Sequence, residues 1–146
     1  MGEVFGEKHS GCSYSVRKGV YAVILDKKKE NVLTVQTGIQ HHFLPGGGME
    51  EGEGKEDCLR RELLEETGYR IELAGFIGNA MRYFITRKGE YQLSDGYFYR
   101  AALLEQIQEP VDADHRLKWI GVDEAEAKLF HEHHIWAVKK VKSAYS

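Results

Sequence analysis

The chain has 146 residues, of which 29% are charged and 42% hydrophobic, and its formal net charge is −3. A chain of this length suits a single domain over residues 1–146, which buries roughly two-thirds of its unfolded surface. The composition excludes a disordered or fibrous protein, and the acidic balance argues against extended nucleic acid as a partner.

The sequence has no sign of a membrane or secretory segment. No apolar run approaches the roughly 20 residues of a membrane span, and the start MGEVFGEKHS lacks the regions of a signal peptide. We therefore expect no membrane partner and a cytoplasmic location. Cys12 and Cys58 are too few for a disulfide framework, so both are expected to be reduced thiols.

The first part of the chain shows the pattern of buried strands. Residues 19–25 form a continuous apolar run, which indicates a strand buried on both faces. The polar residues 26–31 predict a turn into a second strand at 32–36. A short extended piece is expected at 43–44, because Pro45 disfavours helical angles in the residue before it.

A glycine loop and a helix follow. Residues 46–48 predict a loop whose backbone approaches a ligand closely, and the helix is expected from about 55 to 66, ending at Gly68. The predicted buried stripe of this helix consists of Cys58, Leu59 and Leu63.

The second half alternates strand and helix patterns. We expect strands at 70–77, 80–86, 90–104 and 117–122, a hairpin turn at 87–89, a polar loop at 105–116, and helices at 123–129 and 132–145. Four residues are expected to pack the last helix: Ile135, Trp136, Val138 and Val141. This order favours an α/β or α+β sandwich with a mixed sheet.

Three acids of the first predicted helix share one face. At about 100° per residue, Glu62 and Glu66 lie about 40° apart, and Glu65 lies about 60° to the other side of Glu62. Like charges at this spacing destabilise a helix, whereas a hard cation such as Mg²⁺ or Mn²⁺ would reverse that effect. For the three acids alone, a solvated acidic face remains an alternative.

The spacing of the surrounding residues is more specific. Counting from Gly47, the chain places one acid after five residues and the Arg-Glu-Leu triplet after seven more; the positions are Gly47, Glu53, Arg61-Glu62-Leu63, Glu65-Glu66 and Gly68-Tyr69. Residues 47–69 thus resemble the Nudix box, the signature of the Nudix (MutT-like) hydrolases. Tyr69 departs mildly from the pattern, because this position is usually aliphatic.

The resemblance implies a fold and a metal site. The implied fold is an α/β/α sandwich with a mixed β-sheet, in which the box forms loop, helix and loop. Glu62 and Glu66 would be Mg²⁺ ligands, with Mn²⁺ as a substitute. The backbone carbonyl of Gly47 would be a further ligand, and Glu65 would be a ligand or the general base.

Further roles are expected for charged residues in and outside the box. Arg61 and Glu53 carry opposite charges and are expected to join helix to loop through a charge-assisted pair, the alternative being a surface salt bridge of little worth. Glu65 is the first choice of catalytic base. The acids outside the box that are considered for this role are Glu90, Glu109, Asp112 and Asp114, of which we favour Asp114.

The implied reaction is attack of water on phosphorus in a diphosphate linkage, with a nucleoside diphosphate joined to another moiety as the small-molecule substrate. The expected substrate contacts are Phe43, Gly46, Gly47 and Asp114. No substrate signature outside the box is matched, so a broad nucleoside-triphosphate or nucleoside diphosphate-sugar pyrophosphohydrolase is the default expectation, and the sequence predicts no particular oligomeric state. A nucleotide-sensing domain without turnover is the alternative function, and a zinc-binding or metal-buffering protein is weaker still.

Histidines occur in two groups. His131, His133 and His134 lack the i,i+4 pair of a zinc-protease helix, because Ile135 fills that position, and we expect a polar helix start there. His41-His42 precede the glycines; we expect an exposed loop, with substrate contact as the alternative.

Overall fold

A mixed five-stranded sheet forms the centre of the protein. The computed structural model describes residues 3–38, 41–111 and 114–145. The sheet has the order β1-β6-β7-β2-β5. Its strands are β1 (Glu3–Phe5), β2 (Ser15–Val23), β5 (Gly46–Gly48), β6 (Tyr69–Ile85) and β7 (Tyr91–Gln106). The pairs β1–β6 and β2–β7 are parallel, whereas β6–β7 and β2–β5 are antiparallel, which confirms the predicted mixed sheet.

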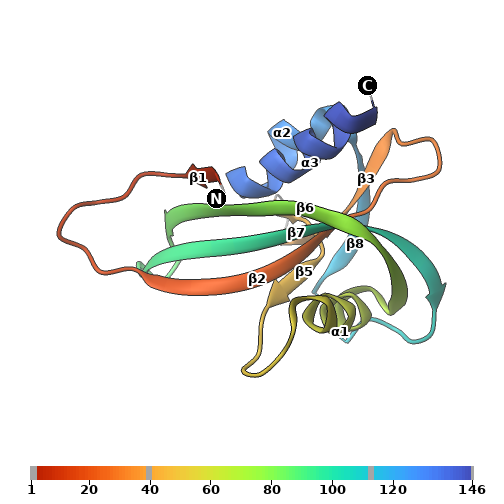
Figure 1. Cartoon of the computed structure of the whole chain (residues 1–146), viewed down its shortest axis with the longest axis horizontal. Coiled ribbons are helices and arrows are strands. Elements are labelled where there is room, and N and C mark those ends of the chain that lie inside the picture. The colour runs from red at the N-terminus through yellow and green to blue at the C-terminus, as the bar shows by residue number, and fades with distance from the viewer. Residues whose placement is uncertain (1–2, 39–40, 112–113, 146) are drawn as a thin grey trace.

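A smaller antiparallel sheet and the helices complete the fold. The small sheet has the order β4-β3-β8, with strands β3 (Asn31–Thr37), β4 (His41–Phe43) and β8 (Arg116–Gly121). The helices are α1 (Lys55–Thr67), a 3-10 turn η1 (Val122–Glu124), α2 (Ala125–Lys128) and α3 (Glu132–Tyr145). α1 lies on one side of the large sheet and α2 and α3 on the other, which confirms the predicted α/β/α layers (Figure 1).

Two hydrophobic cores lie on opposite faces of β2, because alternate residues of a strand point to opposite faces. Val20, Ala22 and Ile24 pack under α1, whereas Val23 packs in the core that α3 covers. Of the four predicted packing residues of α3, Val138 and Val141 are buried, and Ile135 and Trp136 are partly buried against the same core.

The two strands predicted at 70–77 and 80–86 are one continuous strand. β6 bends through register shifts against β7, and Gly75 and Gly78 have φ values of 151° and 153° there. Such bulges redirect a strand without ending its pairing, so the glycines do not interrupt β6.

The segments before α1 are also more regular than predicted. Gly46–Gly48 is not a free loop: it forms β5 and pairs with residues 19–21 of β2. His41 and His42 lie in β4, and their side chains are half-buried rather than exposed in a loop. Pairing with distant strands therefore orders both segments, and a local pattern does not reveal that.

The expected polar start of the last helix is wrong. His133 and His134 are 1% and 0% exposed, because the first turn of α3 packs onto the large sheet. The rings of His131, His133 and His134 lie 4.8–5.1 Å apart, and Phe98 contacts the latter two. We call these three residues the histidine cluster.

The expectations for the end of α1 and for the two cysteines are met. Gly68 ends α1 in the left-handed conformation, with φ 77°, and its N–H donates to the Leu64 carbonyl. Cys12 and Cys58 are both free. Over the described part of the chain, no helix has the length and apolar character needed to span a bilayer.

Candidate active site

Helix α1 is held against β5 by its apolar stripe. Cys58, Leu59 and Leu63 are fully buried under the large sheet, as the sequence predicts. Because α1 runs along the edge strand β5, the side chains of Glu62 and Glu66 reach the glycines of that strand. The apolar stripe thus fixes the position of the acidic face.

Two carboxylates meet neighbouring residues of β5. A Cβ on Gly47 would lie 2.5 Å from the carboxyl carbon of Glu62, so only glycine allows this approach. The Gly46 N–H donates to Oε1 of Glu66 over 2.7 Å. Glu62, Glu66 and the Gly47 backbone therefore come together as predicted.

Arg61 joins α1 to the preceding loop. Its Nε and Nη2 donate to the two oxygens of Glu53 over 2.6 and 2.9 Å, and Nη2 also donates to the Gly48 carbonyl over 3.1 Å. Hydrogen bonds from Arg61 lower the pKa of Glu53 to about 2, and the same bonds raise the pKa of Arg61. The expected charge-assisted pair is confirmed, and its bidentate geometry exceeds that of an ordinary surface salt bridge.

Glu65 lies further out on the same helix. Its side chain is 47% exposed, and its carboxylate lies 3.4 Å from Nη1 of Arg61, which also donates to Glu62 over 3.0 Å. Arg61 therefore lies between Glu62 and Glu65. Glu65 is open to solvent, as a residue that exchanges protons with water needs to be.

The oxygen donors fit a hard divalent cation. Burial raises the pKa of Glu62 despite the opposing charge of Arg61, so a further positive charge would stabilise its ionised form. Carboxylate and carbonyl oxygens are the ligands that Mg²⁺ prefers. Within residues 3–38, 41–111 and 114–145, however, no three His, Cys, Asp or Glu side chains are already grouped to hold a metal.

The segment before β8 also reaches the box helix. The Val111 N–H donates to the Glu65 carbonyl over 2.8 Å, and Nδ1 of His115 lies 3.6 Å from Oε2 of Glu66. Asp114, the favoured acid outside the box, is exposed and adjacent in sequence to His115. Its neighbour His115 is a site residue that the sequence interpretation missed, and only this adjacency signalled it.

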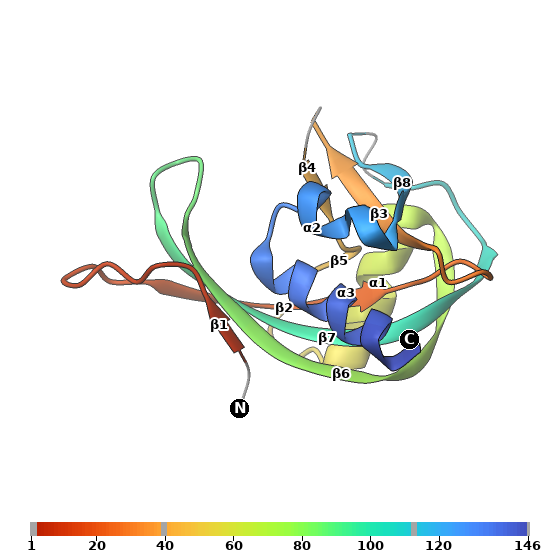
Figure 2. The same cartoon turned by 90° about the horizontal axis from the view of Figure 1, so that it is seen from above.

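The other acids considered as bases differ in position. Glu109 lies in the same segment, two residues before Val111, and is exposed. Glu90 lies in the β6–β7 turn, where its carbonyl accepts from the Thr86 N–H, and this turn projects away from α1 (Figure 2). Asp112 falls outside the described residues.

Phe43, an expected substrate contact, belongs to an aromatic group at the start of α3. Its ring centroid lies 5.5 Å from those of Phe130 and His131, and His41 lies 4.6 Å from Phe130. Nη1 of Arg82 lies 3.0 Å from Nδ1 of His131. We call Phe43, Phe130, His131 and His41 the aromatic cluster.

The histidine cluster connects this region to the box. The Leu44 N–H donates to Nδ1 of His134 over 3.1 Å, two residues before Gly46 and its bond to Glu66. His134 thus holds the β4–β5 connection from the α3 side. No local sequence pattern signals this contact, since it joins residues 90 positions apart.

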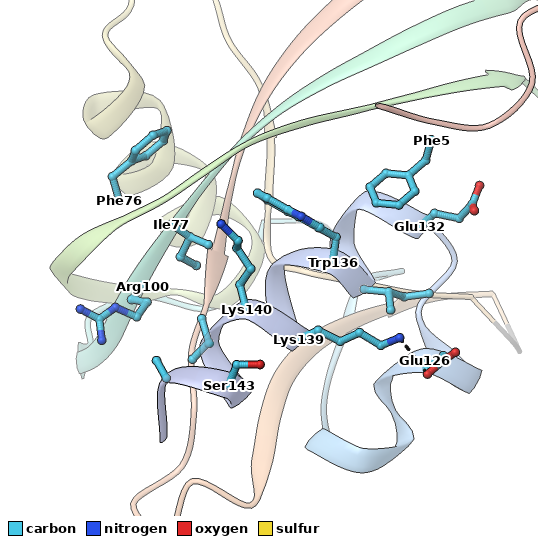
Figure 3. Close-up of a pocket in the computed structure, with 13 residues that line it drawn as sticks. Phe5, Phe76, Ile77, Arg100, Glu126, Glu132, Trp136, Lys139, Lys140 and Ser143 are labelled. Carbon is cyan, nitrogen blue, oxygen red and sulfur yellow. Dashed lines mark ion pairs between the residues drawn. The ribbon is translucent and has the colours of Figure 1, made fainter. Parts of the chain in front are cut away.

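A separate cavity lies between α3, β1 and β6 (Figure 3). It has a volume of about 800 Å³, and Trp136 lies in its wall with Nζ of Lys140 5.2 Å from the ring centre. None of its lining residues belongs to 47–69, so the candidate chemistry is not located in it.

Two curated proteins match part of the chain. A Danio rerio protein named oxidized purine nucleoside triphosphate hydrolase is 39% identical over 79 residues, which are 53% of this chain and 47% of that protein. A Bacillus subtilis protein described as a candidate 8-oxo-dGTP diphosphatase is 26% identical over 104 residues, 71% of this chain and 66% of that protein. The chain thus spans less than two-thirds of either relative.

Solved structures share the fold. A NUDIX hydrolase from Nitrosomonas europaea superposes with a TM-score of 0.71 at 21% identity, covering 89% of this chain and 90% of that one. A MutT NUDIX hydrolase from Burkholderia pseudomallei gives 0.65 at 23% identity, covering 87% and 98%. The family model described as the NUDIX domain matches residues 16–140. The chain therefore belongs to the NUDIX family.

Proposed function

We propose that the protein is a Mg²⁺-dependent pyrophosphohydrolase that cleaves a diphosphate linkage in a nucleotide. One observation carries the proposal: Glu62 and Glu66 meet adjacent residues of β5, while Arg61 fixes helix to loop. This arrangement gathers hard oxygen donors at the edge of the sheet, where a phosphate chain can reach them. Membership of the NUDIX family supports the reaction class.

The protein side chains have separate roles in this proposal. Glu62, Glu66 and the Gly47 carbonyl hold Mg²⁺, with Glu65 as a further ligand or the general base. When bound, the ion supplies charge stabilisation to phosphate oxygens and acidifies a water molecule. The exposed carboxylate of Glu65 accepts the proton of the attacking water. Glu53 and Arg61 hold the carboxylates of α1 in position relative to β5.

The proposed substrate class is a nucleoside triphosphate. The aromatic cluster lies beside the β4–β5 connection and offers ring faces to a base, with Phe43 as the expected contact. The two curated relatives are named for oxidised purine nucleotides, and this supports including 8-oxo-dGTP among the candidates. Gly46 and Asp114 remain proposed substrate contacts.

Turnover of a nucleotide panel tests the proposal. The purified protein with Mg²⁺ is incubated with nucleoside triphosphates, 8-oxo-dGTP and nucleoside diphosphate-sugars, and release of pyrophosphate or of a nucleoside monophosphate is measured. Chelation of Mg²⁺ should abolish turnover. Tight binding of one nucleotide without any turnover would instead support a nucleotide sensor and contradict the enzyme.

A matched pair of variants then tests the site. Glu66→Gln should lower kcat by at least about 100-fold, because it removes a ligand charge yet keeps an oxygen that accepts from Gly46. Glu56→Gln makes the same change on the exposed face of α1, where Glu56 contacts Arg60 over 3.7 Å, and should leave kcat within about twofold. Equal activities of the two variants would contradict the site.

A further inference from the structure

Arg17 lies directly on the glycine strand of the candidate site. In the antiparallel pairing of β2 with β5, Gly19 stands opposite Gly48. Arg17 shares a face of β2 with Gly19 and Tyr21, because residues two apart point the same way. A Cβ on Gly48 would lie 3.1 Å from both Nε and Nη2 of Arg17. The guanidinium therefore rests on the backbone next to Gly47.

This arginine is exposed, and its donors are available. Within the described ranges, which leave out 1–2, 39–40, 112–113 and 146, no hydrogen bond or ion pair engages its side chain. Arg61 differs, since its donors bind Glu53, Glu62 and the Gly48 carbonyl. A planar guanidinium with free donors binds phosphate oxygens in a bidentate manner.

The position of Arg17 connects the two parts of the site. Gly48, which the guanidinium contacts, is next in the chain to Gly47, whose backbone the carboxylate of Glu62 approaches. On the face of β2 that carries Arg17, the ring of Tyr21 lies 4.5 Å from that of His134, which lies 5.1 Å from the ring of His131 in the aromatic cluster. Arg17 thus lies on the face of β2 that connects the acidic face of α1 with the aromatic cluster. A nucleotide spanning these regions passes its phosphates beside Arg17.

We propose that Arg17 binds a phosphate of the substrate between the carboxylates of α1 and the aromatic cluster. This inference rests on the proposed function, since it names a substrate contact of the same site. A polyphosphate brings several negative charges to a site already rich in carboxylates, and Arg17 offsets that repulsion where Arg61 cannot. Lys18 is no substitute, because it points to the opposite face of β2.

Kinetics and calorimetry of Arg17→Gln test the inference. For the best nucleotide of the panel, KM should rise about 10- to 100-fold with a smaller change in kcat, as expected for loss of hydrogen bonds to a charged group. The affinity for inorganic pyrophosphate with Mg²⁺, measured by titration calorimetry, should fall by a similar factor. Since Arg17 is exposed, the melting temperature should be unchanged.

Three further variants sharpen the result. Lys18→Gln removes the same charge from the neighbouring residue and should change KM and pyrophosphate affinity less than about twofold. Arg17→Lys keeps the charge but loses the paired donors of the planar guanidinium. Its KM and pyrophosphate affinity should lie between those of wild type and Arg17→Gln. Gly48→Ala should displace the guanidinium and reproduce part of the loss of affinity.

Failure of the proposed enzyme activity and failure of the Arg17 inference give different results. If the wild-type protein turns over no compound, the proposed enzyme activity fails, whereas calorimetry still decides phosphate binding by Arg17. If Arg17→Gln binds pyrophosphate and nucleotide as tightly as wild type does, or if Lys18→Gln weakens binding equally, the inference is overturned.

Discussion

The Arg61–Glu53 pair and the histidine cluster both withdraw titratable groups from water, the pair partly and the cluster almost fully, and the two differ in how they hold charge. Arg61 and Glu53 stay charged, because Nε and Nη2 of Arg61 each donate to an oxygen of Glu53. The histidines stay neutral, because burial lowers the pKa of His131 to about 2 and of His133 to about 3. A titratable group keeps its charge where an oppositely charged partner is held beside it, and it loses its charge where burial is not offset by such a partner.

The same comparison separates two pH ranges. The pKa of Glu53 is depressed to about 2, so its stabilising contribution is present above its ordinary value of 4.5 and is lost as pH falls toward 2. The lowered pKa values of the histidines also destabilise the fold in acid, because the unfolded state binds protons first. Their effect begins at a higher pH, below about 6.5.

The largest expected effect is therefore a loss of stability in mild acid. Between pH 7.5 and 5.5, each buried histidine should lower the free energy of unfolding by about 1.4 kcal/mol, so the three together lower it by about 4 kcal/mol. The positive charge of Arg82 beside them further opposes their protonation. Denaturant unfolding monitored by circular dichroism at several pH values measures the change.

The range from pH 7.5 to 9 provides the control, since the histidines are then neutral in both folded and unfolded states. Stability should change little there on their account. A free energy of unfolding that stayed constant down to pH 5.5 would show that the histidines are accessible to protons in the folded protein.

The next effect concerns the charged pair. Arg61→Gln should lower kcat/KM by about 100-fold, because α1 and the loop lose their link and the carboxylates shift relative to β5. Arg60→Gln is the matched control on the same helix: the side chain of Arg60 is 51% exposed and lies 3.6–3.7 Å from Glu56 and Asp57. It should keep kcat/KM within about twofold. Similar losses in both variants would show that net helix charge, not the Glu53 contact, matters.

The charged pair was predictable from sequence, and the histidine cluster was not. Glu53 and Arg61 lie eight residues apart within one motif, so their contact depends on a short loop and one helix. α1 is predicted to within a residue at its C-terminal end for the same reason, since Gly68 is a local stop signal. Local spacing thus carries most of the information about the box.

The parts that the sequence did not predict depend on distant partners. β5 exists because residues 46–48 pair with β2, and His134 is buried where it meets Leu44 in the β4–β5 connection. Residues 131–134 are three histidines and one glutamate, so their composition predicts a polar helix start. Only the packing of this segment on the sheet shows that the histidines are buried. Arg17 is an intermediate case between these two groups. In the sequence it is one of several basic residues, and only its contact with Gly48 in the structure distinguishes it from the others.

The smallest expected effect tests whether hydrogen-bond partners decide how each histidine of the cluster affects the free energy of unfolding. Both ring nitrogens of His133 are buried without a hydrogen-bond partner in the described part of the chain, whereas Nδ1 of His134 accepts from Leu44. His133→Leu should raise the free energy of unfolding at pH 7.5 by about 1 kcal/mol, because an apolar group of similar size replaces an unsatisfied polar one. His134→Leu should lower it by about 1 to 2 kcal/mol, because the Leu44 N–H loses its acceptor.

Both variants should also reduce the acid loss of stability by about one-third, so the two changes separate hydrogen bonding from proton uptake. Unfolding curves at pH 7.5 and 5.5 measure both quantities, and a destabilised His133→Leu would show that its ring nitrogens have partners, such as ordered water, in the folded protein.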